Sequence, residues 1–85
     1  MYQLFLSTRA EKQFARLSAS LQQRITDAFG ALRENPRPRG CLKLKGEDNL
    51  WRIRVGDYRV VYTIEDDKLI VLVVRVAHRK DVYHE

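Results

Sequence analysis

Apolar and basic residues alternate with a period of two along residues 51–62, break at Gly56-Asp57 and then resume the alternation. Alternation over this length predicts two strands, and a central Gly-Asp pair predicts a two-residue hairpin turn between them. With that turn, Ile53 faces Val60 across the hairpin. One face of the hairpin is then apolar and is expected to pack on the core; it carries Trp51, Ile53, Val55, Tyr58, Val60 and Tyr62.

The opposite face of the same hairpin is basic. It carries Arg52, Arg54 and Arg59, and the turn places Arg54 directly opposite Arg59. Like charges that face each other across a sheet are destabilising. A single arginine of this kind is explained by a solvated face on which its long side chain covers apolar surface. Three of them on one face indicate an anionic ligand.

Two amphipathic helices are predicted before the hairpin, after a short apolar strand at residues 2–6. Thr8 with Glu11 and Ser20 with Gln23 fit two capping boxes, which predict where the helices begin. Apolar residues recur at helical spacing after each of these starts. The two stripes consist of Ala10, Phe14 and Leu17 in the first helix and of Leu21, Ile25, Ala28, Phe29 and Leu32 in the second.

The rest of the chain divides into loops and one further strand. Residues 35–49 open with Asn-Pro and are expected to form a basic loop, and residues 65–68 are expected to form a turn. The near-continuous apolar run at 69–76 predicts a strand that is central in the sheet or buried on both faces. Residues 77–85 form a polar tail. The order β-α-α-β-β-β predicts an α+β fold, with an antiparallel helical hairpin on one face of a small antiparallel sheet.

Composition limits the classes of function. The chain has 85 residues, which predicts a single domain over 1–85, and a net charge of +5, which favours a polyanionic partner. The longest apolar run is too short to span a bilayer, and no signal segment opens the chain. The single cysteine, Cys41, excludes an internal disulfide. We therefore expect a cytoplasmic protein without membrane association.

Arginine is the residue type that carries candidate chemistry. No His, Cys, Asp or Glu cluster has metal-ligand spacing and no glycine-rich phosphate loop exists, so neither a metal nor a cofactor is expected. Guanidinium groups bind phosphate in a bidentate manner and stabilise developing charge, but they cannot accept a proton near neutral pH. An enzyme built on these arginines needs a separate proton acceptor, and Tyr83 and His78 are the candidates.

Three stretches resemble the RelE toxins of bacterial and archaeal toxin–antitoxin systems. They are Leu-Lys-Gly at 44–46, the hairpin at 51–62, and Val-Arg-Val-Ala-His-Arg-Lys-Asp-Val-Tyr at 74–83. Chain length and the predicted helical hairpin also fit this family. The resemblance implies a RelE-like fold and a metal-independent endoribonuclease that cuts messenger RNA in the ribosomal A site. In that reaction the 2′-hydroxyl attacks the adjacent phosphate and leaves a 2′,3′-cyclic phosphate.

The resemblance also implies roles for individual residues. Arg59 would stabilise the transition state, Arg79 would lie at the leaving 5′-oxygen, and Tyr83 would activate the 2′-hydroxyl or stack on a base. His78 would be a base or the acid at the leaving group. Arg52 and Arg54 occupy positions where the best-known members have lysine, so no group there can lose a proton. Basic residues expected to contact RNA are Arg37, Arg39, Lys43, Lys45 and Lys80.

A partner follows from the resemblance as well. Such toxins are neutralised by a small antitoxin, so we expect a cognate antitoxin, the ribosome and mRNA as partners, with DNA bound only through the antitoxin complex. Two alternatives stay open. The first is a ParE-like toxin of the same fold that inhibits DNA gyrase. The second is a catalytically inactive basic module that binds RNA or protein. The feature that supports it is the presence of arginine in place of lysine at positions 52 and 54.

Overall fold

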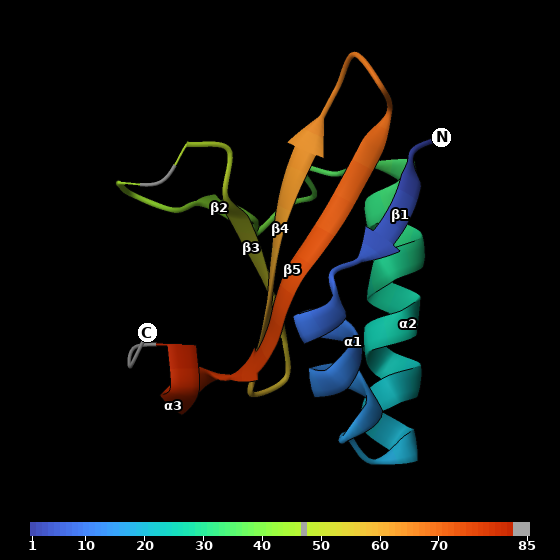
Figure 1. Ribbon diagram of the computed structural model, residues 1–85, viewed down its shortest axis with the longest axis vertical. Helices are drawn as coiled ribbons and strands as arrows, with labels where there is room; N and C mark the ends of the chain where they lie inside the picture. The colour runs from blue at the N-terminus through green and yellow to red at the C-terminus, as the bar shows by residue number, and fades with distance from the viewer. Residues whose placement is uncertain (47, 83–85) are drawn as a thin grey trace.

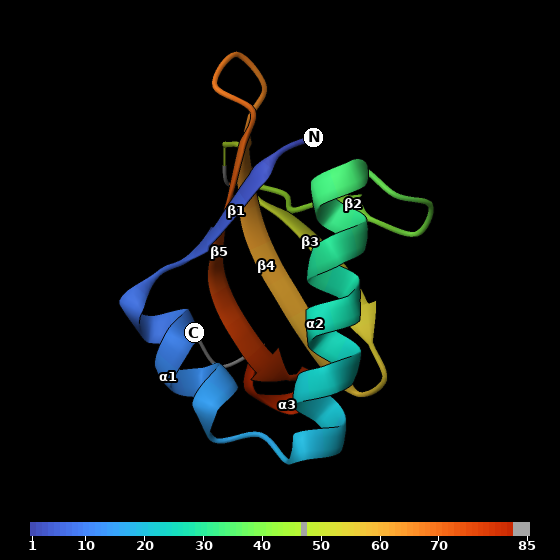
Figure 2. The ribbon, with the colours of Figure 1, turned by 90° about the vertical axis from the view of Figure 1, so that its right-hand side faces the viewer.

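The computed structural model describes residues 1–46 and 48–82. Two helices that run in opposite directions lie on one face of a five-stranded sheet, and Figure 2 shows both of them in front of that face. The α+β class and the helical hairpin are thus confirmed. The elements run in the order β1 (Gln3–Leu6), α1 (Thr8–Ala15), α2 (Ala19–Glu34), β2 (Leu42–Lys43), β3 (Trp51–Val55), β4 (Tyr58–Glu65), β5 (Ile70–His78) and α3 (Arg79–Val82) (Figure 1).

The sheet is mixed, whereas a wholly antiparallel sheet was predicted. Its strand order is β1-β5-β4-β3-β2, and β1 pairs with β5 in parallel, with Leu4 opposite Val71. Parallel pairing requires a long crossover, which the helices and the hairpin strands supply between β1 and β5. The strand β5 lies inside the sheet, which confirms its central position. Only one of its faces is fully buried, since Val71 and Val73 are buried while Leu72 between them is half-buried.

The hairpin of β3 and β4 has the predicted register. Ile53 lies opposite Val60 and Arg54 lies opposite Arg59, so the apolar side chains point to the helices and the arginines to the open face of the sheet. Gly56 occupies the first position of the turn with φ of 60°. Glycine adopts this left-handed conformation without steric cost, and it suits the twist of a two-residue hairpin.

A β-bulge interrupts the pairing of β4 with β5. Val61 pairs with Arg75 and Tyr62 pairs with Val73, so Val74 is an extra residue on β5. A bulge of this kind resets the alternation of a strand by one position. As a result Arg75 lies on the open face beside Val61, whereas Val76 is buried on the helix side at 2% exposure.

The helices start one or two residues earlier than the capping boxes predicted. The hydroxyl of Ser7 accepts the N–H of Ala10 at 3.1 Å, and the hydroxyl of Ser18 accepts the N–H of Leu21 at 3.2 Å. Both serines are in extended conformation, as an N-cap residue must be. Thr8 is therefore the first residue of α1 and not its cap.

The predicted loop before the hairpin contains the two-residue strand β2, which pairs with β3. Asn49 then adopts a left-handed conformation with φ of 58°, and its side-chain amide bonds the backbone of Ile64: Nδ2 donates to the carbonyl at 2.8 Å and Oδ1 accepts the N–H at 3.4 Å. This side chain takes the place of a strand residue at the edge of β4.

The core lies between the helices and the inner face of the sheet. It is formed by buried apolar side chains from α1, α2, β3, β4 and β5, and the hydroxyl of Tyr62 donates to the carbonyl of Pro36 at 2.7 Å inside it. Burial raises the pKa of the Tyr62 phenol. Within the described ranges, none of the helices has the length and apolar character needed to cross a membrane.

Candidate functional site

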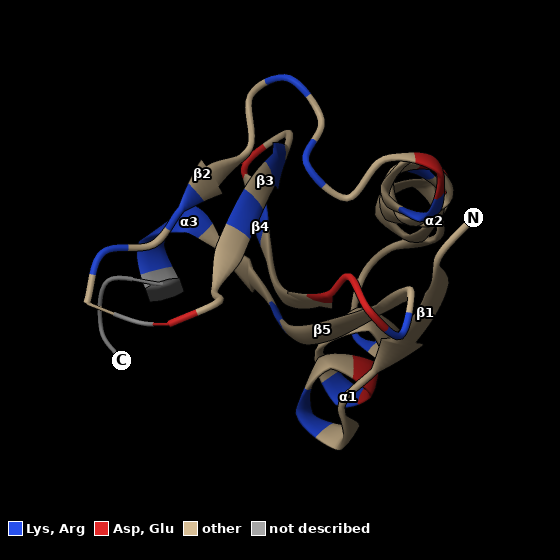
Figure 3. Cartoon of the chain, turned by 90° about the horizontal axis from the view of Figure 1, so that it is seen from above, with Lys and Arg blue, Asp and Glu red and all other residues tan. Residues whose placement is uncertain are grey.

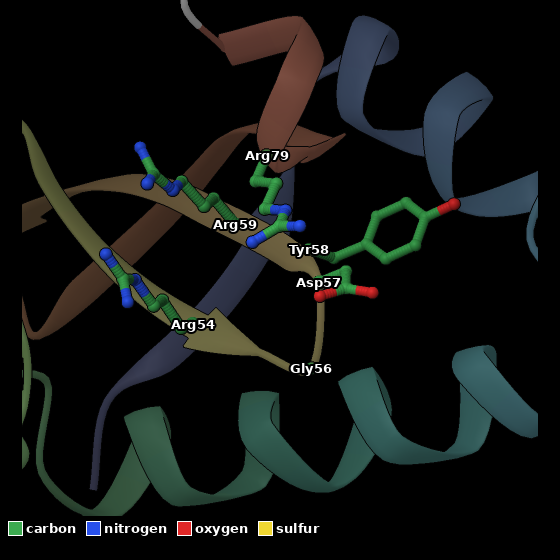
Figure 4. Close-up of a pocket in the computed structure, with 6 residues that line it drawn as sticks. All are labelled: Arg54, Gly56, Asp57, Tyr58, Arg59 and Arg79. Carbon is green, nitrogen blue, oxygen red and sulfur yellow. The ribbon is translucent and has the colours of Figure 1, made fainter.

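A pocket of about 220 Å³ opens at the end of the sheet where the hairpin turns and α3 begins. We call it the arginine pocket. Arg54 comes from β3, Arg59 from β4 and Arg79 from the start of α3, and Figure 4 shows their side chains around one hollow. The hairpin and the start of α3 thus each contribute arginines to the lining of one pocket. The lining residues are Arg54, Gly56, Asp57, Tyr58, Arg59 and Arg79.

A backbone hydrogen bond positions Arg79. Its N–H donates to the carbonyl of Asp57 at 2.8 Å, which joins the first residue of α3 to the hairpin turn. The turn therefore holds Arg79 close to Arg54 and Arg59, although the chain between Arg59 and Arg79 runs up β4 and back down β5. The figure of charged residues shows the result: Lys and Arg lie along β3, around β2 and on α3, at the side away from β1 (Figure 3).

Arg59 is the most enclosed of the three guanidinium side chains. It is 9% exposed and pairs with Arg54 on one side and with Ala77 on the other. The small side chain of Ala77 leaves room next to it, while the strands fix its stem. A guanidinium stays charged throughout the physiological range. Its enclosure places a fixed positive charge in a site with reduced access to water, where electrostatic interactions are stronger.

Arg52 lies one row further along the open face, outside the arginine pocket. It pairs with Val61 on β4 and with Leu42 on β2. Arg75 lies in the same row, on the far side of Val61. Burial first, and the charge of Arg9 second, lower the pKa of Arg75. The open face therefore carries two rows of arginines, and the row that contains Arg59 lines the pocket.

His78 is not brought into the arginine pocket. It pairs with Tyr58, on the helix side of the sheet, and the two rings meet edge to face with centroids 5.4 Å apart and an interplanar angle of 83°. Its Nδ1 accepts the N–H of Lys80 at 3.2 Å. The alternation of β5 explains this placement, since Ala77 takes the position beside Arg59. The geometry therefore does not support the predicted role of His78 as an acid or base at the arginines.

Arg37 serves the opposite end of the molecule. Its guanidinium binds Asp66 in a bidentate manner, at 3.1 and 2.9 Å, and Asp66 also accepts the hydroxyl of Tyr2 at 2.7 Å. The hydrogen bonds from Arg37 and then from Tyr2 lower the pKa of Asp66 to about 2. Arg37 also lies over the ring of Trp51 at 5.0 Å. These contacts give Arg37 a structural task, and its contact with RNA stays a prediction.

The other residues predicted to contact RNA are exposed. Arg39, Lys43 and Lys45 lie on the segment around β2, and Lys80 lies on α3 next to the arginine pocket. Lys43 also approaches the Trp51 ring, at 5.9 Å. Their contact with RNA stays a prediction. Tyr83, the predicted proton acceptor, lies outside the described residues.

Sequence reasoning missed Asp57 as a lining residue of the arginine pocket. The Gly-Asp pair indicated a turn and nothing more, yet the turn carries a carboxylate into the site (Figure 4). A carboxylate can act as a general base, whereas a guanidinium cannot. The sequence did contain a signal, since this turn directly joins the two strands that carry Arg54 and Arg59.

The pocket has the chemistry to hold a phosphodiester and to stabilise negative charge that builds on it. Three guanidinium groups supply paired donors for phosphate oxygens. Among residues 1–46 and 48–82, no group of three or more His, Cys, Asp or Glu side chains gathers in a way that could hold a metal ion. The charge that the described site offers to an anion comes from its arginines.

The relatives found by comparison with known proteins include several RelE toxins. The mRNA interferase toxin RelE of Escherichia coli is 30% identical over 88 residues, which cover 99% of this chain and 92% of that protein. The intact E. coli RelBE toxin–antitoxin complex matches with a TM-score of 0.81 and 28% identity, over 92% of this chain and 96% of that one. The RelE–RelB complex of the archaeon Pyrococcus horikoshii matches with the same TM-score of 0.81 and 25% identity, over 92% and 94% of the two chains.

A family model gives the same assignment. The model describes the ParE toxin of the type II toxin–antitoxin system parDE, and it matches residues 4–83 of the chain. This range contains α1, α2 and α3, all five strands of the sheet apart from the first residue of β1, and the three arginines of the pocket. The chain therefore belongs to the RelE/ParE family of toxins from type II toxin–antitoxin systems.

Proposed function

We propose that this protein is a ribosome-dependent endoribonuclease that cleaves messenger RNA in the A site through attack of a 2′-hydroxyl on the adjacent phosphate. The observation that carries the proposal is the convergence of Arg54, Arg59 and Arg79 on one pocket. A relative that covers nearly all of the chain is named mRNA interferase. An RNA phosphodiester is the substrate that three permanently charged forks suit, because its charge increases in the transition state.

In this mechanism each arginine stabilises a different part of the negative charge that develops in the transition state. Arg59, which is enclosed, stabilises the oxygens of the phosphorane-like transition state. Arg79, fixed to the turn by its N–H, stabilises the leaving 5′-oxygen. Arg54 holds the phosphate from the other side, and Arg52 in the next row contacts the neighbouring backbone.

The proton of the 2′-hydroxyl needs an acceptor, since the arginines offer none. Tyr83 keeps this role as a prediction. Asp57 is the second candidate, because its carboxylate lines the same pocket and its backbone carbonyl already anchors Arg79.

The test is toeprinting of translating ribosomes with purified protein. Arg59→Gln and Arg79→Gln are each expected to slow mRNA cleavage about 100-fold or more, as loss of one transition-state donor does, with an unchanged circular dichroism spectrum. Lys68→Gln is the matched control, since this exposed lysine lies in the turn between β4 and β5 at the opposite end of the molecule (Figure 1). Wild-type cleavage by both arginine variants would refute the mechanism.

A gyrase inhibitor of the ParE kind is the second candidate, and the description of the matching family model favours it. It predicts intact mRNA together with DNA damage in growth-arrested cells. If the protein caused neither cleavage nor DNA damage, a basic module without catalytic activity would remain.

We also propose a cognate antitoxin as partner, because the similar solved structures include RelE–RelB complexes. With a net charge of +5 on the toxin, an acidic antitoxin segment would associate quickly through electrostatic steering.

A further inference from the structure

A second pocket lies on the helix side of the sheet, next to the arginine pocket. We call it the aromatic pocket. Its volume is about 220 Å³, and its walls are Tyr58, the end of β5 with His78, and the C-terminal part of α1 with Gln13 and Arg16. Tyr58 lines both pockets. Figure 4 shows how: the ring of Tyr58 turns away from the three arginines and toward α1.

The walls of the aromatic pocket combine two rings with polar groups. The rings of Tyr58 and His78 meet edge to face at 5.4 Å, and both residues are half-buried, so part of each ring remains open. The side-chain oxygen of Gln13 accepts the N–H of Val76 at 2.7 Å. This hydrogen bond fixes the amide beside the part of β5 that extends past the end of β1. The side chain of Arg16 is exposed at the end of α1.

This combination fits a nucleobase better than an anion. Bases bind proteins by stacking on aromatic rings and on guanidinium planes, and by hydrogen bonds to amide and guanidinium donors. A phosphate would find one arginine in this pocket, Arg16, against three in the arginine pocket. The two pockets therefore differ in the part of a nucleotide that each one suits.

The shared wall links the two pockets. Tyr58 follows the hairpin turn and Arg79 follows His78, so both pockets lie at the same end of the sheet. A single RNA strand held at its phosphate by Arg59 and Arg79 can pass around this end. We propose that the aromatic pocket is a nucleobase subsite, which takes a base adjacent to the phosphate held in the arginine pocket. This inference rests on the proposed function.

The test uses short single-stranded RNA with a 2′-deoxy sugar at the scissile position, so that it binds without being cut. Affinity is measured for this RNA and for versions that lack the base on the 5′ or the 3′ side of the phosphate. We expect the wild-type protein to bind one abasic version about 5- to 100-fold more weakly, the range for loss of one stacked base. Tyr58→Leu should abolish this difference, and Tyr58→Phe should keep it.

Arg16→Gln provides a variant whose fold is not at risk, because Arg16 is exposed. It should reduce the discrimination between intact and abasic RNA several-fold, whereas Lys12→Gln, an exposed cation of the same helix outside the pocket, should leave it unchanged. Arg59→Gln should weaken binding of all the RNAs and reduce the salt dependence while the discrimination persists.

Equal affinity of the wild-type protein for intact and abasic RNA would overturn the subsite. If Arg59→Gln still weakened binding of both, the arginine pocket and the proposed function would stand. Absence of binding to every RNA at low salt would overturn the subsite, and toeprinting of translating ribosomes would then test the proposed function separately. Ring signals of Tyr58 and His78 in NMR spectra give a readout that does not depend on affinity, since they should shift with intact RNA and not with the abasic version.

Discussion

The two faces of the β3–β4 hairpin carry opposite chemistry on one backbone. On the inner face Ile53 pairs with Val60, and both are buried against the helices. On the outer face Arg54 pairs with Arg59, two positive charges directly opposite each other. The inner pair stabilises the sheet through burial and the outer pair destabilises it through repulsion. Folding stability therefore explains the inner pair. It does not explain the outer pair, for which we infer a role in ligand binding.

The outer face is tolerated because the inner face holds the strands in place. At 85 residues the domain has an adequate core and little to spare, so a row of facing arginines is a real cost. An anion in the arginine pocket would relieve the repulsion. Substitutions at neighbouring positions of the same strands can therefore separate the two contributions.

The largest effect is expected from the inner face. Ile53→Ala should lower the free energy of unfolding by about 2–5 kcal/mol, because it leaves a cavity beneath the sheet. Ile53 is 8% exposed and packs in the core cluster. Urea denaturation measures the change, and Arg54→Ala is the matched control at the next residue. Equal losses from the two variants would contradict the comparison.

A smaller effect is expected at Tyr62, the largest fully buried side chain of the inner face. Tyr62→Phe should cost about 1–2 kcal/mol, since the carbonyl of Pro36 loses its donor inside the core. Burial raises the pKa of the Tyr62 phenol, so the folded state keeps a proton that the unfolded state releases above pH of about 10. Stability should therefore fall as the pH rises through this range.

The variant supplies the control for this pH dependence. Tyr62→Phe lacks the group, so its stability should decline less than that of the wild-type protein between about pH 9 and pH 11. The other tyrosines titrate in both proteins. Parallel declines of the two proteins in urea denaturation would show that the buried phenol is not the cause.

The smallest effect is expected from the outer face and has the opposite sign. Arg54→Gln should raise the free energy of unfolding by about 0.2–1 kcal/mol at low salt, because it removes the like charge opposite Arg59. The gain should shrink at about 1 M salt, where charges are screened within roughly 3 Å. Arg39→Gln, in the loop before β2, is the control, and an equal gain there would mean that only net charge matters.

Much of the fold could be predicted from the pattern of apolar residues. The register of β3 with β4 followed from alternation around one Gly-Asp pair, and the helices followed from their stripes and a following Asn-Pro. The caps were misplaced because Ser7-Thr8 and the serines at positions 18 and 20 offer competing hydroxyls. The parallel pairing of β1 and the two-residue strand β2 depend on contacts distant in sequence, which no local pattern records.

Local sequence patterns also predicted part of the candidate site. Arg54 and Arg59 follow from local alternation, and the resemblance gave Arg79 a role in the reaction. The position of His78 on the helix side of the sheet could not be predicted, because the alternation along β5 could not be followed through a bulge that only the pairing with β4 defines. The ion pair of Arg37 with Asp66 could not be predicted, because the two residues lie far apart in sequence and the turn that contains Asp66 looked solvated.

The β-bulge at Val74 sets which side of the sheet the following residues of β5 occupy. If Val74 took a regular place after Val73, Arg75 would enter the core and Val76 would leave it. Because the pairing with β4 passes over Val74, Arg75 stays on the open face and Ala77 lies beside Arg59. Deleting Val74 would therefore remove the bulge and leave both faces of β5 as they are, so the bulge lets this strand carry one residue more than its partner without exchanging the core and the arginine pocket.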